Sequence, residues 1–282
     1  MPETKDTTPI SGTDDDPDRA MPLKLLQITD THLFADPKGR LLGQNTRHTF
    51  ESVLELARER FWPPDAIVLT GDLVHDALPD AYQYLRGQLS DLGIPFFSVP
   101  GNHDLPNLIT STLNSGPGHS VRSTQQRGWS LVLIDSTMPS TAGGHLSHSL
   151  LACLEHELGA HPDLHTLIGM HHQPVPVGSA WIDSMALDNS NELFSITDRH
   201  PQVRGILCGH IHQAFSARHG ALMLLGSPST CIQFLPGSEH FALDSLTPGF
   251  RWLELFRNGR IETGIERLAA YPDPLKITNH GY

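Results

Sequence analysis

The chain has 282 residues, of which 38% are apolar and 18% are charged, a composition that excludes a disordered protein and provides for a sizeable core. Its 19 Lys and Arg stand against 31 Asp and Glu, and the net charge of −12 argues against a general nucleic-acid binder, which needs a basic face. The sequence has no leader-like segment and no apolar run of the ~20 residues that cross a membrane. We therefore expect a cytoplasmic protein with no nucleic-acid and no membrane partner.

The two ends of the chain differ in composition from its middle. Residues 1–20 carry six acidic side chains against Lys5 and Arg19 and almost no large apolar residue, so we expect a disordered acidic tail. Residues 269–282 contain Pro272 and Pro274 and show no periodicity, which indicates a C-terminal tail. The sequence thus predicts a single domain over residues 21–268.

Strands and helices alternate through the first part of this domain. In chain order, apolar runs and helical spacing predict a strand over 23–28, a helix through 50–61 capped by Asn45 or Thr46, a strand over 66–69, a helix over 82–92, a strand over 96–99, a strand over 131–134, a helix over 150–158, a strand over 166–170, a helix over 193–199 and a strand over 205–208. From about residue 215 the pattern changes to short β runs over 221–225, 232–235, 250–256 and 261–265. This order predicts an α/β fold in which two mixed sheets pack together between flanking helices, an α/β/β/α sandwich.

Polar residues follow the C-terminal ends of five of these strands, the edge where α/β proteins bind ligands. In chain order they form the motifs Asp30-Thr31-His32, Gly71-Asp72, Gly101-Asn102-His103-Asp104, His171-His172 and Gly209-His210-Ile211-His212. Side chains two positions apart in an extended segment point to the same side, so the first and last motifs can each present two ligands to one point. Oxygen and imidazole donors without thiolates suit Mn, Fe or Zn.

The number of these donors exceeds the coordination of one ion and fits two ions that share a bridging carboxylate. Asp72 is the natural bridge, because Gly71 lets the backbone come close. Asn102 offers a neutral carbonyl ligand, and His103 is left to protonate a departing oxygen. Two ions that share a ligand in this way clamp the attacking and leaving oxygens of a phosphoryl displacement.

The ordered series D-x-H, G-D, G-N-H-D, H-H-x-P and G-H-x-H resembles the calcineurin-like metallophosphoesterases. Four further runs, 170–178, 181–183, 208–213 and 227–234, resemble one branch of this family. That branch is the class III 3′,5′-cyclic-nucleotide phosphodiesterases of the bacterial cyclic-AMP type. The similarity extends from about Leu23 to Leu268, which implies the metallophosphoesterase fold for the whole predicted domain.

The resemblance implies a role for each motif residue. It implies a first metal site made by Asp30, His32, Asp72 and His212, and a second made by Asp72, Asn102, His171 and His210. The two divalent or trivalent ions are expected to be Fe, Mn or both, with Zn as the alternative. A hydroxide that bridges them is implied to attack phosphorus in line with the leaving ribose oxygen.

The catalytic and substrate-binding residues follow from the same resemblance. His103 is implied to stabilise or protonate the leaving oxygen, with Asp72 and Asn102 as the other catalytic residues. The substrate phosphate is expected against His32, Asp72, Asn102, His103, His171 and His212.

These roles predict a hydrolase that converts a small-molecule substrate, 3′,5′-cyclic AMP or another cyclic nucleotide, to the 5′-monophosphate. An alternative is a broad-specificity metallophosphodiesterase acting on 2′,3′-cyclic nucleotides or glycerophosphodiesters. A non-catalytic scaffold with this fold is a third interpretation, although none of the family's metal ligands is missing here. The sequence leaves the metal identity, the preferred nucleotide and the oligomeric state open.

Four positions near the motifs have competing interpretations. Where the phosphatase branch pairs the catalytic His with an Asp, this chain has His75, so the partner of His103 is not identified. His172 is expected to orient a neighbour or touch the phosphate, with His171 as the ligand. Trp181 either stacks on the nucleoside base or packs within its own loop. Asp104 is interpreted as a cap for the helix that follows it.

Overall fold

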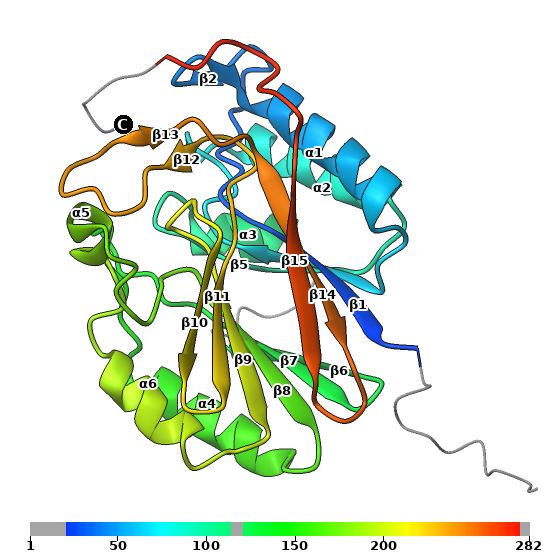
Figure 1. The fold of residues 1–282 in the computed structure, drawn as a ribbon, viewed down its shortest axis with the longest axis vertical. Helices are drawn as coiled ribbons and strands as arrows, with labels where there is room; N and C mark the ends of the chain where they lie inside the picture. The colour runs from blue at the N-terminus through cyan, green and yellow to red at the C-terminus, as the bar shows by residue number, and fades with distance from the viewer. Residues whose placement is uncertain (1–20, 114–120, 277–282) are drawn as a thin grey trace, which may run out of the picture.

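The structure, a computed structural model, describes residues 21–113 and 121–276, so the predicted acidic tail and residues 277–282 lie outside the described residues. Two large sheets form the centre of the domain (Figure 1). The first has the strand order β15 (Ile261–Arg267), β14 (Gly249–Leu255), β1 (Leu23–Ile28), β4 (Ala66–Thr70) and β5 (Phe96–Val99). The second has the order β10 (Phe215–His219), β11 (Leu222–Gly226), β9 (Val203–Cys208), β8 (His165–Gly169), β7 (Trp129–Ile134) and β6 (Val121–Gln126).

Both sheets combine parallel with antiparallel strands, and every edge strand is antiparallel to its neighbour except β5 of the first sheet. In the first sheet β1, β4 and β5 are parallel, with Ile28 opposite Leu69. In the second sheet β7, β8, β9 and β11 are parallel, with Gly169 opposite Leu207. The remaining strands of the two sheets, β6, β10, β14 and β15, pair antiparallel to their neighbours. This register brings the C-terminal ends of β1, β4 and β5 to one edge of their sheet, and those of β8 and β9 to one edge of the other.

Helices cover the outer face of each sheet, as Figure 1 shows for α1 and α2 on one side and α4 and α6 on the other. The first sheet packs against α1 (Thr46–Arg60), α2 (Pro79–Asp91) and α3 (Pro106–Thr112), and the second packs against α4 (His148–Ala160) and α6 (Ser190–Thr197). Between the sheets, Val68 and Leu253 of the first meet Leu133 and Leu167 of the second in one buried cluster. The predicted α/β/β/α sandwich is confirmed.

Three short elements complete the described residues: the hairpin β2 (Arg40–Leu41) and β3 (Gln44–Asn45), helix α5 (Ala180–Asp183), and the hairpin β12 (Gln233–Phe234) and β13 (Leu243–Asp244). Part of the predicted C-terminal tail lies against the first hairpin, where Lys276 N donates to Leu42 O at 2.8 Å and the Gln44 side chain donates to Asp273 O at 2.7 Å. Within the described residues, no helix has the length and apolar character needed to cross a membrane.

The ends of the helices test two sequence interpretations. The side chain of Asn45 caps α1 and accepts a hydrogen bond from His48 N, so the choice between Asn45 and Thr46 falls on Asn45. The expected capping role of Asp104 is wrong. The N-cap position of α3 is Leu105, and no side chain caps that helix.

Candidate active site

Five residues that follow strands β1, β4 and β9 have an unusual backbone. Asp30, His32, Asp72, His210 and His212 all have φ between 43° and 67°, the left-handed region that such side chains rarely adopt. Backbone of this kind costs about 1–3 kcal/mol per residue and clusters at functional sites. The strand-end loops therefore fold into tight turns that aim these side chains at one place.

Glycines make the close approach of these loops possible. A Cβ atom at Gly71 would collide with the ring of His171, and one at Gly101 would collide with the carboxylate of Asp72. Gly71 and Gly101 are therefore required because neighbouring site residues leave no room for a side chain at these positions.

One group of predicted ligands consists of Asp30, His32 and His212, all buried. The Nε2 atoms of the two imidazoles lie 3.2 Å apart, and His212 Nε2 is 3.5 Å from Asp30 Oδ1. His212 Nδ1 donates to Ile232 O at 2.8 Å, which leaves Nε2 with an unprotonated lone pair when the ring is neutral. Unprotonated nitrogen and carboxylate oxygen thus face one another, an arrangement that a cation stabilises.

A second group lies beside the first, with Asp72 between them. Asp72 Oδ2 is 3.8 Å from His32 Nε2 and 3.5 Å from His171 Nε2, so one carboxylate faces both groups. His171 Nε2 also lies 3.1 Å from Asn102 Oδ1, while its Nδ1 is 2.8 Å from Thr70 O and donates to it. His210 Nε2 is buried and has no hydrogen-bond partner among the described residues.

We call these seven residues the Asp/His cluster: Asp30, His32, Asp72, Asn102, His171, His210 and His212. They are the predicted metal ligands, and the structure places all of them at one edge of the sheets. Their donors are imidazole nitrogens, carboxylates and one amide oxygen, a set that fits first-row transition metal ions. The unpartnered His210 nitrogen and the facing lone pairs show that the residues present fit metal ions.

The electrostatics of the cluster also favour cations. Burial raises the pKa of Asp72, but the surrounding His171, His103 and His32 lower it well below its usual range. Burial lowers the pKa of His32 and of His210 well below the usual range, so both rings are neutral and each has a nitrogen lone pair. Burial also lowers the pKa of His171, but Asp72 and Asp30 outweigh it and raise the value to about 9. The cluster therefore favours positive charge at His171 Nε2, which a metal ion would supply in place of the proton.

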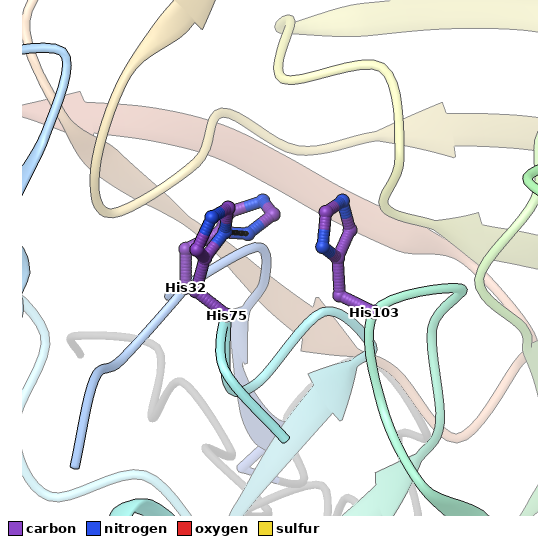
Figure 2. Close-up of side chains that lie close together, drawn as sticks. All are labelled: His32, His75 and His103. Atoms are coloured by element: carbon purple, nitrogen blue, oxygen red, sulfur yellow. Dashed lines mark hydrogen bonds between the residues drawn. The ribbon is translucent and has the colours of Figure 1, made fainter. Parts of the chain in front are cut away.

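Three histidines stand together at one side of the cluster, and Figure 2 shows His103 facing His32 and His75. The rings of His75 and His103 stack with centroids 5.1 Å apart and 23° between their planes. His75 Nδ1 lies 3.4 Å from His32 Nδ1. His75 thus contacts both a predicted metal ligand and the predicted acid, in the place where the phosphatase branch has Asp.

His172 belongs to a different network from its neighbour. Its Nε2 lies 3.1 Å from Ala142 O and donates to it, so Nδ1 accepts the hydroxyl hydrogen of Ser136 at 2.8 Å. Burial and the charge of His171 lower the pKa of His172 to about 3, so the ring is neutral. Both ring nitrogens are engaged with protein atoms, an arrangement that suits orientation of the 142–144 loop rather than metal binding.

The sequence reasoning missed several residues that support the cluster. Phe234 stacks on His212 with ring centroids 4.0 Å apart and 14° between the planes. The hydroxyl of Ser136 and the carbonyl of Ile232 each hold one imidazole. Asp104 accepts hydrogen bonds from the loops of two motifs. Asp104 lies within the Gly-Asn-His-Asp motif, and Ile232 and Phe234 lie within the run 227–234, but the sequence does not indicate their contacts with the cluster.

Comparison with known proteins agrees with this geometry. The family model for calcineurin-like phosphoesterases matches residues 23–214. The 3′,5′-cyclic adenosine monophosphate phosphodiesterase CpdA of Vibrio vulnificus is 40% identical over 92% of this chain and 95% of its own length. A 3′,5′-cyclic-nucleotide phosphodiesterase of Nostoc is 40% identical over 92% of this chain and 97% of its own. The CpdA of Escherichia coli K12 is 39% identical over 88% of this chain and 90% of its own.

Solved structures share the fold at lower identity. A dimetal phosphatase of Danio rerio has a TM-score of 0.61 and 18% identity over 87% of this chain and 99% of its own. A purple acid phosphatase of yellow lupin has a TM-score of 0.62 and 12% identity over 86% of this chain and 51% of its own. The family model, the relatives along nearly the whole chain and the Asp/His cluster agree that this chain belongs to the calcineurin-like phosphoesterase family.

Proposed function

We propose that this protein is a metal-dependent phosphodiesterase that hydrolyses 3′,5′-cyclic AMP to 5′-AMP. The observation that carries the proposal is the position of Asp72, whose Oδ2 faces His32 Nε2 on one side and His171 Nε2 on the other. The relatives named as cyclic AMP phosphodiesterases, which match nearly the whole chain, supply the substrate class.

The proposed metal ligands are the seven residues of the Asp/His cluster, divided into two sites that share Asp72. Fe and Mn suit its nitrogen and oxygen donors, with Zn as the alternative. Two such ions, when bound, supply the positive charge that binds a phosphodiester and makes water a nucleophile at neutral pH. They also explain how a chain with a net charge of −12 accepts an anionic substrate.

The side chains of the cluster and His103 have separate proposed tasks. His32, Asp72, Asn102, His171 and His212 position the phosphate and its metal ions. His103 is half-buried and lines the cavity beside the cluster, so its imidazole can reach the leaving group. As the bond from phosphorus to the ribose 3′-oxygen breaks, His103 donates a hydrogen bond or a proton to that oxygen.

Removal of metal tests the class of enzyme. We expect a chelator to abolish hydrolysis of cyclic AMP and added Mn²⁺ or Fe²⁺ to restore it, with 5′-AMP as the product on chromatography. Comparison of 3′,5′- and 2′,3′-cyclic AMP at matched concentration tests the substrate. If the metal-loaded protein cleaves an artificial bis-aryl phosphate but leaves cyclic AMP intact, the enzyme class stands and the substrate assignment is wrong.

Substitution of His103 tests the leaving-group role. We expect His103→Ala to lower kcat for cyclic AMP by about 10²-fold, because the ribose alkoxide leaves poorly without a proton. The loss should be much smaller for a p-nitrophenyl diester, whose phenolate leaves without protonation. His148→Ala is the matched control, since that side chain is 96% exposed. Equal losses on both diesters would contradict the role.

A further inference from the structure

A cavity opens beside the Asp/His cluster and includes Asp72, His210 and His212 in its lining. Its lining falls into two chemical groups. The polar group belongs to the cluster and to His103. The apolar group consists of Ala142, Trp181, Ile182, Met185, Phe234 and Phe241.

Three of the apolar residues form one continuous surface, which we call the aromatic wall: Trp181, Phe234 and Phe241. Trp181 meets Phe234 and Phe241 edge to face, with ring centroids 4.9 Å and 5.3 Å away. Phe234 is buried beneath the ring of His212, whereas Trp181 and Phe241 are half-buried. The aromatic wall therefore extends from Phe234, which contacts the predicted metal ligand His212, to Trp181 and Phe241, whose partly exposed rings line the cavity.

The loop that carries Trp181 is held in place by polar contacts. The carboxylate of Asp183 accepts hydrogen bonds from Val177 N at 2.7 Å and from Gly178 N at 2.9 Å. Ser179 Oγ accepts a hydrogen bond from Gly237 N at 3.0 Å, which ties the loop to the chain between β12 and β13. The Trp181 loop is thus preorganised, so a ligand that stacks on this ring loses little affinity to ordering of the loop.

We propose that the aromatic wall is the subsite for the nucleobase, which stacks on Trp181 and Phe241 while the cyclic phosphate lies at the Asp/His cluster. The inference rests on the proposed function and names the part of the substrate that the cluster does not bind. A flat, neutral base suits a wall of aromatic rings without charge. Stacking area grows with ring size, so purine cyclic nucleotides bind better than pyrimidine ones.

The test compares cyclic AMP with a base-free analogue, the 3′,5′-cyclic phosphate of methyl riboside, on the metal-loaded enzyme. The quantity measured is the ratio of kcat/KM for cyclic AMP to kcat/KM for the analogue. We expect Trp181→Ala and Phe241→Ala each to lower this ratio about tenfold or more, mainly through KM for cyclic AMP. Trp181→Phe should retain most of the ratio, because it keeps an aromatic face. Leu246→Ala, at a side chain that is 49% exposed outside the cavity, is the control that leaves the ratio unchanged.

The outcomes separate the subsite from the proposed function. A loss of folding lowers the activity on both substrates and leaves their ratio unchanged, so the ratio reports on binding of the base alone. If the ratio stays within twofold of the parent value in both alanine variants, the proposed subsite is wrong. Quenching of tryptophan fluorescence by 5′-AMP gives a second readout, expected in the parent protein and absent in Trp181→Phe. If cyclic AMP is not hydrolysed but 5′-AMP quenches Trp181, the proposed function fails and the subsite stands. If cyclic AMP is hydrolysed without quenching and with an unchanged ratio, the proposed function stands and the subsite fails.

Discussion

Replacement of Asp72 by alanine is expected to lower kcat/KM for cyclic AMP at least about 10³-fold and to reduce the metal content of the purified protein. The carboxylate Oδ2 lies 3.5 Å from His171 Nε2 and 3.8 Å from His32 Nε2, so its loss removes the only side chain proposed for both metal sites. Asp72 Oδ1 also accepts a hydrogen bond from His103 N at 2.9 Å. The substitution therefore affects the ligand set and the loop of the predicted acid together.

Metal analysis and activity should be measured on the same preparation of each variant. Asp72→Asn separates charge from shape, and we expect it to retain the fold while losing most of the metal. Asp198→Ala is the matched control, because Asp198 is 61% exposed and pairs with His219 at 3.0 Å. The control should keep its metal content and activity. Retention of more than a tenth of the parent activity and of the full metal content by Asp72→Ala would show that Asp72 is not a shared ligand.

The elements that carry the site are those with the strongest local signals. The apolar runs that predict strands over 23–28 and 96–99 coincide with the bounds of β1 and β5. Each of these strands is short, apolar and followed by polar residues, so its end is evident without tertiary information. Because parallel strands end at a common edge, the sequence alone predicts that the motif residues lie together.

Elements without a local signal were not predicted. β6 is the polar edge strand VRSTQQ, and it is placed in the sheet by antiparallel pairing with β7. β10, at the other edge, alternates between half-buried and exposed side chains and depends on β11. The orientation of the imidazole rings in the Asp/His cluster could not be predicted from the sequence either. The carbonyl that orients His171 belongs to Thr70, which is 101 positions away in the chain.

Asp104 is a further example, because three of its four hydrogen-bond partners lie 22 to 31 positions away in the sequence. Its Oδ2 accepts from Leu73 N at 3.0 Å and Gly101 N at 2.8 Å, and its Oδ1 accepts from Val74 N at 3.2 Å and Tyr82 Oη at 3.0 Å. The carboxylate therefore ties the loop after β4 to the loop after β5. These two loops carry the Gly-Asp and Gly-Asn-His-Asp motifs.

Replacement of Asp104 by asparagine tests two opposing effects on stability. Burial, together with the nearby Asp72, raises the pKa of Asp104 to about 7, so loss of charge alone should stabilise the fold. Four donors point at the two oxygens, however, and an asparagine NH₂ would face two of them in either orientation. An unsatisfied buried donor costs about 1–3 kcal/mol, so we expect a loss of about 2–4 kcal/mol in the free energy of unfolding.

Denaturant unfolding measures this loss, and Tyr82→Phe is the companion variant. The phenol donates to Asp104 and accepts from Leu105 N at 2.9 Å, so its removal should cost less, about 1 kcal/mol. Activity should fall in Asp104→Asn under conditions where the protein remains folded, because the two loops that carry Asp72 and His103 are no longer tied together. If Asp104→Asn is as stable as the parent, the charge of the buried carboxylate outweighs its hydrogen bonds, and the geometry of the two motif loops is maintained by the packing of their glycines instead.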